Sequence, residues 1–263
     1  MPIVDVNGAT ITYTDSGGDG PAVVLSHGYL MDHTMFDAQV AALGPEYRVI
    51  TWDERGFGGT RAQSAFTYWD SAADVLGLLD HLGVGQAVLG GMSQGGFLSL
   101  RAALLAPDRV RALVLIDSQA GQEDAAAAPQ YEEMERIWLE HGPGPVQDVV
   151  ASIILGPPNG PVDYAPWFVK WALIGRQDIL FAFRCLMDRD DITGRLGEIS
   201  CPALIIHGTA DAAIPMERAE AVRDGLAGPA TLVQIDGGSH AANLSHPGPV
   251  NTAMLDFLRA LPA

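Results

Sequence analysis

Short apolar runs alternate with amphipathic stretches along most of the chain. A short apolar run bounded by glycine, proline or polar residues is typical of a strand buried on both faces. Such runs are found at residues 21–28, 47–52, 86–90, 110–116, 201–208 and 230–235. Helical spacing is found between them at 35–43, 70–82 and 97–106, and two strands at 2–6 and 9–15 flank the hairpin dipeptide Asn7-Gly8. Strands and helices in alternation predict an α/β fold with a mostly parallel sheet.

The character of the chain changes between residues 119 and 198. This segment opens with an alanine-rich acidic stretch, is interrupted by proline and glycine clusters, and holds three of the five tryptophans. Helical spacing within it is found at 130–141, 145–155, 165–174 and 177–186. We therefore expect an α/β core made of residues 1–118 and 199–263, with a helical cap of residues 119–198 inserted into it.

One serine lies where a predicted strand, a sharp turn and a predicted helix meet. Ser93 is the centre of Gly91-Met92-Ser93-Gln94-Gly95, directly after the strand 86–90. Glycine two residues to either side of the serine removes side chains that would collide in a strained turn, and the following helix points its amino terminus at the same place. This context predicts a nucleophile. The alternative is a glycine-rich turn with a serine on the surface.

A nucleophilic serine needs a general base, because an alcohol is a weak nucleophile at neutral pH. Of the seven histidines, His240 follows the last predicted strand, in a loop at the edge where parallel sheets carry functional residues. His246 directly precedes Pro247 at the expected start of the last helix, which favours a role in helix entry. His27 and His207 each end a strand and precede glycine, which favours structural roles in turns. We predict His240 as the base.

The base in turn needs an acid that fixes its tautomer and stabilises its charged form. Asp211 lies in the loop that leaves a predicted strand and is our candidate, while Asp117 at the end of the preceding strand is the rival. The chain order of the three groups is then Ser93, Asp211, His240. The alternative role for Asp211 is a turn aspartate that caps a helix beginning near Pro215.

Two backbone N–H groups are predicted to bind the negative oxygen that develops on a carbonyl under attack. Gln94 directly follows the serine, where the amino terminus of the next predicted helix points, so its N–H is expected to be free. Tyr29 follows the glycine turn after the strand 21–28, and its N–H approaches from the other side. Only the main chain of Tyr29 is required, so its ring is free to line the acyl pocket.

These motifs together resemble the α/β-hydrolase superfamily over essentially the whole chain. The matching landmarks are His27-Gly28-Tyr29, Asp53-Glu54-Arg55-Gly56-Phe57-Gly58, Gly91 to Gly96, Pro202 to Asp211, and Gly237-Gly238-Ser239-His240. The resemblance implies an eight-stranded, mostly parallel sheet whose second strand is antiparallel, with a helical cap after the sixth strand. Among its members the chain looks most like small bacterial esterases, enol-lactonases and cofactor-free haloperoxidases or perhydrolases. Epoxide hydrolases and haloalkane dehalogenases carry aspartate at the nucleophile position, so Ser93 argues against both.

One departure from these relatives is Gln94, where many haloperoxidase-like and lactonase members have methionine. The backbone donor is unchanged by this difference. The glutamine side chain adds a possible hydrogen bond near the oxyanion, so no subfamily's substrate transfers directly to this chain.

The composition narrows the set of partners. A formal net charge of −17, with Lys170 as the only lysine among 263 residues, disfavours nucleic acid and anionic membranes. We find no apolar run of about 18 residues and no amino-terminal signal pattern, and we expect a cytoplasmic protein. Cys185 and Cys201 are too few for a disulfide framework, and no cluster has metal-ligand spacing, so we predict neither metal nor cofactor.

The aromatic residues of the predicted cap indicate a mainly apolar substrate. Trp138, Trp167 and Trp171 are our candidates for substrate contact, although packing is the commoner role of such side chains. We therefore predict a serine hydrolase that cleaves a small ester or lactone through an acyl-enzyme on Ser93. The alternatives are perhydrolase or haloperoxidase chemistry, cleavage of a carbon–carbon bond with the same triad, and a ligand receptor with slow hydrolysis.

Overall fold

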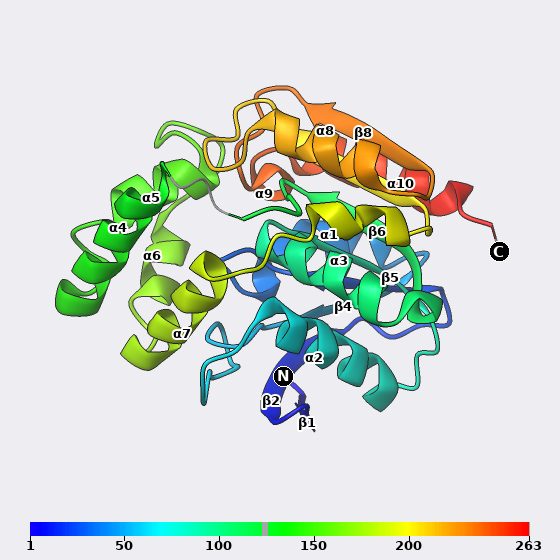
Figure 1. The fold of residues 1–263 in the computed structure, drawn as a ribbon, viewed down its shortest axis with the longest axis horizontal. Coiled ribbons are helices and arrows are strands. Elements are labelled where there is room, and N and C mark those ends of the chain that lie inside the picture. The colour runs from blue at the N-terminus through cyan, green and yellow to red at the C-terminus, as the bar shows by residue number, and fades with distance from the viewer. Residues whose placement is uncertain (123–125, 263) are drawn as a thin grey trace.

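A single sheet of eight strands runs through the molecule in the computed structural model, which describes residues 1–122 and 126–262 (Figure 1). The spatial order of the strands is β1-β2-β4-β3-β5-β6-β7-β8. Their bounds are β1 Ile3–Val6, β2 Ala9–Asp15, β3 Ala22–Ser26, β4 Arg48–Trp52, β5 Ala87–Met92, β6 Val110–Ile116, β7 Ala203–Gly208 and β8 Ala230–Ile235. β2 is antiparallel to both of its neighbours, and the other pairs are parallel. The predicted mostly parallel sheet with an antiparallel second strand is confirmed.

The first two strands form the predicted hairpin. Asn7 and Gly8 both have positive φ angles, +47° and +76°. Two left-handed residues in succession give a turn whose twist matches that of the flanking strands. The asparagine and glycine therefore fix the register in which Val6 pairs with Ala9.

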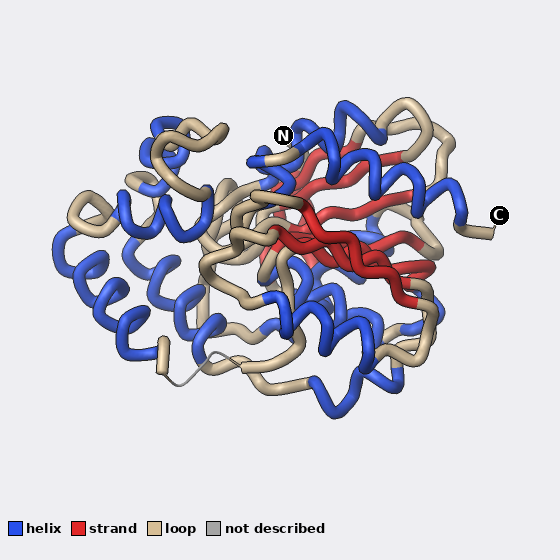
Figure 2. Tube along the Cα trace, turned by 90° about the horizontal axis from the view of Figure 1, so that it is seen from above, coloured by secondary structure: helices blue, strands red, loops and turns tan. Residues whose placement is uncertain are grey.

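Helices cover both faces of the sheet (Figure 2). On one face α1 packs against α10, and on the other α2 packs against α3. The bounds of the core helices are α1 Asp37–Leu43, α2 Tyr68–His81, α3 Gln94–Leu105, α8 Met216–Gly225, α9 Ala242–Ser245 and α10 Pro247–Ala260, with short 3₁₀ helices at His33–Phe36, Pro107–Arg109 and Thr193–Glu198. The central strands β3, β5 and β7 are buried along their whole length, as expected of strands with helices on both faces.

A second group of helices follows β6 and lies beside the core, at the left of Figure 1. Its members are α4 Ala128–His141, α5 Gln147–Leu155, α6 Ala165–Trp171 and α7 Arg176–Met187. Each of these helices begins and ends within a few residues of the bounds predicted from the sequence. The limits 119–198 for a separate cap stay a prediction, and residues 123–125 of that segment lie outside the described residues. Among the residues that the structure describes, no helix has the length and apolar character needed to cross a membrane.

Candidate active site

Ser93 forms the turn between β5 and α3 and has an unusual backbone conformation. Its φ and ψ angles are +52° and −114°. For a residue other than glycine such a conformation is unfavourable by on the order of 1–3 kcal/mol, and it persists only where the surrounding structure imposes it. Here the Ser93 N–H donates to the carbonyl of Ile116 at 2.9 Å, and the Ser118 hydroxyl donates to the Ser93 carbonyl at 2.8 Å. Both bonds fix the turn to the end of β6.

The glycines around Ser93 are required by close backbone contacts. A Cβ atom on Gly91 or on Gly95 would collide with the carbonyl oxygen of Ser26 in the adjacent strand β3. Glycine is therefore the residue that allows β3 and the turn to approach each other at these two positions. Ser93 itself is only 6% exposed and lines a pocket, so the alternative of a surface serine is wrong.

His240 and Asp211 are joined by a hydrogen bond. The distance from His240 Nδ1 to Asp211 Oδ2 is 2.9 Å, and the loops after β8 and β7 carry the two residues. The other carboxylate oxygen of Asp211 accepts the N–H groups of Ala213 and Ile214 at 2.8 and 3.0 Å. Burial acts to raise the pKa of Asp211, but His240 and these two N–H groups hold it below its ordinary value. The carboxylate is therefore kept ionised beside the imidazole.

Asp211 does not cap the helix that follows it, and His246 lies at the start of the last helix, as predicted. α8 begins at Met216 after Pro215, with no side-chain cap, so Asp211 does not cap it. His246 Nδ1 lies 3.0 Å from the Ser245 hydroxyl. It precedes α10, as its position before proline predicts.

Asp117, the alternative candidate for the acid beside His240, hydrogen-bonds to two backbone amides. One carboxyl oxygen accepts the Gly208 N–H at 2.7 Å, and the other accepts the Ala242 N–H at 3.0 Å. These two amides belong to the segments that carry Asp211 and His240. Burial raises the pKa of Asp117 well above its ordinary value, and the charge of Asp211 adds to this effect. Asp117 thus positions the two loops and makes no hydrogen bond to His240 within the described residues.

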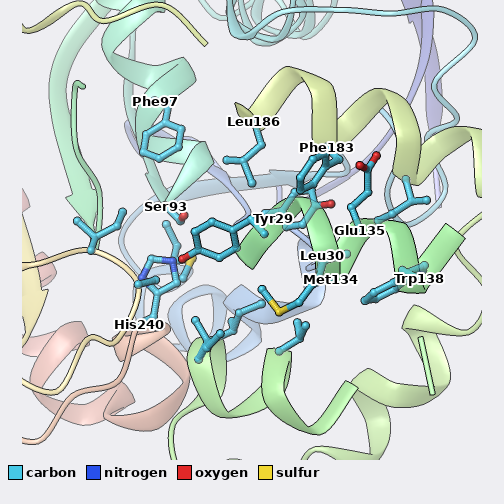
Figure 3. A pocket seen from close by; sticks show the side chains of 18 residues that line it. Tyr29, Leu30, Ser93, Phe97, Met134, Glu135, Trp138, Phe183, Leu186 and His240 are labelled. Carbon is cyan, nitrogen blue, oxygen red and sulfur yellow. The ribbon is translucent and has the colours of Figure 1, made fainter. Parts of the chain in front are cut away.

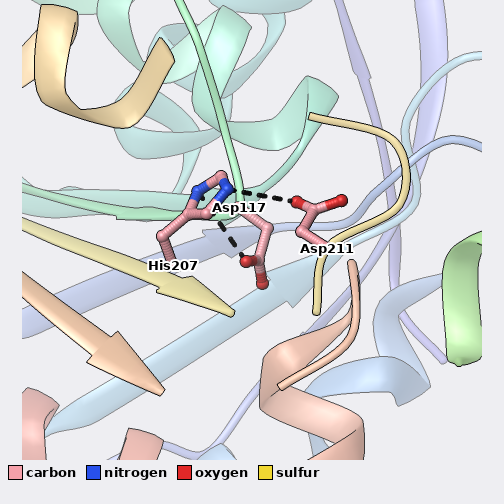
Figure 4. Close-up of side chains that lie close together, drawn as sticks. All are labelled: Asp117, His207 and Asp211. Atoms are coloured by element: carbon pink, nitrogen blue, oxygen red, sulfur yellow. Dashed lines mark ion pairs between the residues drawn. The ribbon is translucent and has the colours of Figure 1, made fainter. Parts of the chain in front are cut away.

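His207 completes a buried cluster with Asp117 and Asp211 (Figure 4). Its Nε2 atom lies 2.9 Å from the Ile214 carbonyl oxygen and 3.4 Å from Asp211 Oδ2. Burial lowers the pKa of His207, so the neutral ring is favoured. The three side chains are close enough together to hold a cation, but the carboxylate oxygens already accept backbone N–H groups and the His240 ring. We assign His207 a structural role, as its position before glycine predicts.

Ser93 and His240 line the same pocket, where Figure 3 shows their side chains next to each other. No hydrogen bond joins the Ser93 hydroxyl to His240 among the described residues. Catalytic hydrogen bonds are often long in an enzyme without substrate and shorten when one binds. The arrangement therefore places the predicted nucleophile and the predicted base in one pocket, with Asp211 hydrogen-bonded to the histidine.

The two predicted oxyanion donors are available. The backbone N–H groups of Tyr29 and Gln94 have no acceptor in the part of the chain that the structure describes. Gln94 is the first residue of α3, so its amide also lies at the positive end of the helix dipole. The Gln94 side chain is buried and accepts the Tyr68 hydroxyl at 3.1 Å. It is absent from the described lining of the pocket, so the additional hydrogen bond considered for this side chain is not made there.

The pocket is mostly apolar and receives one of the three tryptophans proposed to contact substrate. Trp138 lines it, but Trp167 and Trp171 are not among its described lining residues, so the prediction is wrong for these two. Trp171 is fully buried, and its indole N–H donates to the Leu30 carbonyl at 2.7 Å. The Lys170 ammonium lies over the Trp167 ring, 4.5 Å from its centre. The Trp171 ring thus attaches α6 to the core, and the Trp167 ring packs against a lysine of its own helix.

Other side chains of α4 line the pocket and were not identified from the sequence. They are Tyr131, Met134 and Glu135, which share one helical face with Trp138. The spacing i, i+3, i+4, i+7 is the signal that identifies such a face. None of the cap arginines appears in the described lining, and Arg189 instead donates to the carbonyls of Gly121 and Leu186.

A buried glutamate behind the site makes the stability of the protein depend on pH. Glu54 follows β4 and is 1% exposed. Burial, reinforced by the carboxyls of Asp74 and Asp53, raises the pKa of Glu54 well above its ordinary value, and the Gln94 side chain opposes this rise only in part. Because the folded protein holds this proton more tightly than the unfolded chain, the free energy of unfolding is unaffected by the shift below the ordinary pKa of a glutamate. It falls as the pH rises from there toward the raised pKa, by up to about 1.4 kcal/mol per pH unit.

We expect Glu54→Gln to remove this loss. Urea unfolding at several values between about pH 5 and pH 8 measures the free energy of unfolding of both proteins. The free energy of unfolding of the variant, relative to that of the wild type, should increase as the pH rises. Asp117 has the same sign of shift but is present in both proteins, so the difference isolates Glu54. Parallel curves for the two proteins would contradict the assignment.

Comparison with known proteins agrees with the fold. The family model described as alpha/beta hydrolase fold matches residues 21–147, and the one described as TAP-like protein matches residues 188–261. A putative non-heme chloroperoxidase from Synechocystis is 30% identical, over 98% of this chain and 100% of that protein. Epoxide hydrolase A from Mycobacterium tuberculosis is 28% identical, over 98% of this chain and 97% of that protein. The chain therefore belongs to the α/β-hydrolase fold family.

Solved structures support the same assignment. A thermophilic esterase from Thermogutta terrifontis superimposes with a TM-score of 0.90 at 28% identity, with all of both chains covered. The relatives support hydrolase activity for this chain. They are about equally similar to it and differ in their chemistry, so the particular reaction has to be inferred from the site.

Proposed function

We propose that this chain is a serine hydrolase that cleaves carboxylic esters or lactones through an acyl-enzyme on Ser93. The observation that carries the proposal is the strained turn that holds Ser93 in the same pocket as His240, with Asp211 hydrogen-bonded behind it. Similarity to an esterase over the whole chain supports it. Ser93 stands where epoxide hydrolases of this fold carry aspartate, which separates the proposal from that chemistry.

The reaction has two steps. His240 accepts the Ser93 proton as the hydroxyl oxygen attacks the carbonyl carbon, and the ionised Asp211 stabilises the imidazolium that forms. The Tyr29 and Gln94 N–H groups donate to the oxyanion, and His240 then gives its proton to the leaving alcohol. In the second step a water molecule loses a proton to His240 and attacks the acyl carbon, and His240 then returns the proton to the Ser93 oxygen as its bond to the acyl group breaks and the acid leaves. A lactone follows the same course and remains one molecule.

The pocket favours an acyl group of mainly apolar character. Its walls include Leu30, Phe97, Ile154 and Leu186. Apolar surface of this kind contributes about 25 cal/mol for each Å² of substrate removed from water. The described lining contains no arginine, so a substrate with two negative charges has no bidentate partner there.

A fluorophosphonate probe combined with a panel of p-nitrophenyl esters and simple lactones tests the proposal. We expect one label per chain, mapped by peptide mass to Ser93, and multiple rapid turnovers on at least one ester or lactone. Labelling at Ser93 with a single slow burst and no turnover would instead identify a receptor. Formation of peracid from a carboxylate and hydrogen peroxide, without ester turnover, would identify a perhydrolase.

A further inference from the structure

One carboxyl group lines the otherwise apolar pocket at its far end. Glu135 is 9% exposed, and its Oε1 atom is buried with no hydrogen-bond partner among the described residues. In Figure 3 it lies on the side of the pocket away from Ser93 and His240. Leaving a buried polar group unpaired costs about 1–3 kcal/mol, and more for a charged group. Such a group inside a binding pocket indicates a ligand that supplies the missing partner.

Aromatic side chains line the same pocket as this carboxyl group. Trp138 follows one turn later on α4, Phe183 comes from α7, and Tyr29 comes from the core, and all three line the same pocket (Figure 3). Aromatic faces attract cations, and a carboxylate accepts hydrogen bonds from them. The two kinds of group together are the combination that binds an ammonium ion. Both the carboxylate and the aromatic rings favour a chain that ends in a cation over a plain alkyl chain.

The charges near Glu135 leave room for a cation. Burial and the negative charge of Glu132 raise the pKa of Glu135, and the positive charge of Arg184 opposes this rise. A cation bound beside the carboxyl would act in the same direction as Arg184, whose side chain is exposed. The net charge of −17 further favours a cation over an anion in the pocket.

We propose that Glu135 makes this pocket selective for esters or lactones whose acyl part carries an ammonium group at the end away from the reacting carbonyl. Hydrolysis of such an ester rests on the proposed function, whereas binding of the ammonium group by Glu135 does not. Glu135 would act as a specificity residue: it contacts the substrate and takes no part in the proton transfers.

A matched pair of substrates tests the inference. The p-nitrophenyl esters of 6-aminohexanoic and heptanoic acid differ only in an ammonium group in place of a terminal methyl group. The kcat/KM ratio of the two esters is measured for the wild type and for Glu135→Gln, Glu135→Leu and the control Glu132→Gln. Glu132 is exposed on the same helix, so its variant removes an equal charge outside the pocket.

We expect the ratio to fall about 10-fold or more in Glu135→Gln and further in Glu135→Leu, with the Glu132→Gln ratio within about twofold of the wild type. A ratio that Glu135→Gln leaves unchanged, or that Glu132→Gln lowers equally, would overturn the inference.

A binding measurement separates this inference from the proposed function. Calorimetric titration with hexylammonium requires no turnover, and we expect the dissociation constant to rise about 10-fold in Glu135→Gln. If neither ester is hydrolysed but hexylammonium binding depends on Glu135, the proposed reaction is wrong and the cation site stands. If the esters are hydrolysed and hexylammonium binds wild type and variant equally, the reaction stands and the cation site is wrong.

Discussion

Ser93→Ala is expected to lower kcat on any ester that the protein cleaves by a factor of roughly 10⁶, the scale on which loss of a triad nucleophile acts. The alanine has no oxygen to attack the carbonyl, and the remaining oxyanion donors and pocket supply only a residual acceleration. Folding should be retained. Both hydrogen bonds that fix the turn, to Ile116 and from Ser118, use the backbone of residue 93 and not its hydroxyl. Steady-state kinetics and urea unfolding of the same preparations measure the two effects.

Ser99→Ala is the matched control. Ser99 is buried on α3, and its hydroxyl donates to the Gly95 carbonyl of the same helix at 2.6 Å. The substitution removes the same hydroxyl group a short distance away but leaves the nucleophile in place. We expect its kcat to stay within about tenfold of the wild type, since the net loss is one hydrogen bond. Wild-type rates in Ser93→Ala would show that another group attacks the substrate.

The parts of this fold that the sequence predicts are those determined by local chemistry. The strands are recognisable because helices cover both faces of the sheet, which requires continuous apolar runs such as residues 112–116. The hairpin follows from Asn7-Gly8, and the turn at Ser93 follows from glycines that the Ser26 carbonyl requires. In each case a few neighbouring residues leave the backbone one favourable conformation.

The lining of the pocket is not determined in this way. A tryptophan on a helix is equally apolar whether it faces a pocket or a neighbouring helix. Trp138 faces the pocket, but Trp171 is turned to the Leu30 carbonyl by the packing of α6. Glu135 has an acidic side chain that the sequence alone would place in solvent. Its burial results from contacts between helices far apart in the chain, which no local pattern encodes.

Asp117 illustrates the same limit, because its place at a strand end fits a catalytic acid as well as a positioning residue. The structure distinguishes the roles by hydrogen bonds, since Asp211 binds His240 and Asp117 binds the amides of Gly208 and Ala242. The two aspartates are therefore expected to respond differently to the same substitution.

Asp211→Asn should lower kcat by about 10⁴, as in the triad template. The Asn oxygen can still accept the Ala213 and Ile214 N–H groups, which turns its NH₂ group toward His240 Nδ1. The imidazole must then accept at Nδ1 and carry its proton on Nε2, where it cannot act as a base toward Ser93. Steady-state kinetics on the best p-nitrophenyl ester measure this loss, and the free energy of unfolding should change little.

Asp117→Asn should show the reverse pattern. One of its two backbone donors loses its acceptor, which costs about 1–3 kcal/mol of stability because the site is buried. The His240 tautomer is untouched, so kcat should fall only about tenfold, through looser placement of the two loops. If Asp117→Asn lost more kcat than Asp211→Asn at equal folded fraction, the catalytic acid would belong to β6 and not to the loop after β7. Measuring both kcat and unfolding for each variant thus separates the acid that acts on the base from the one that holds the loops together.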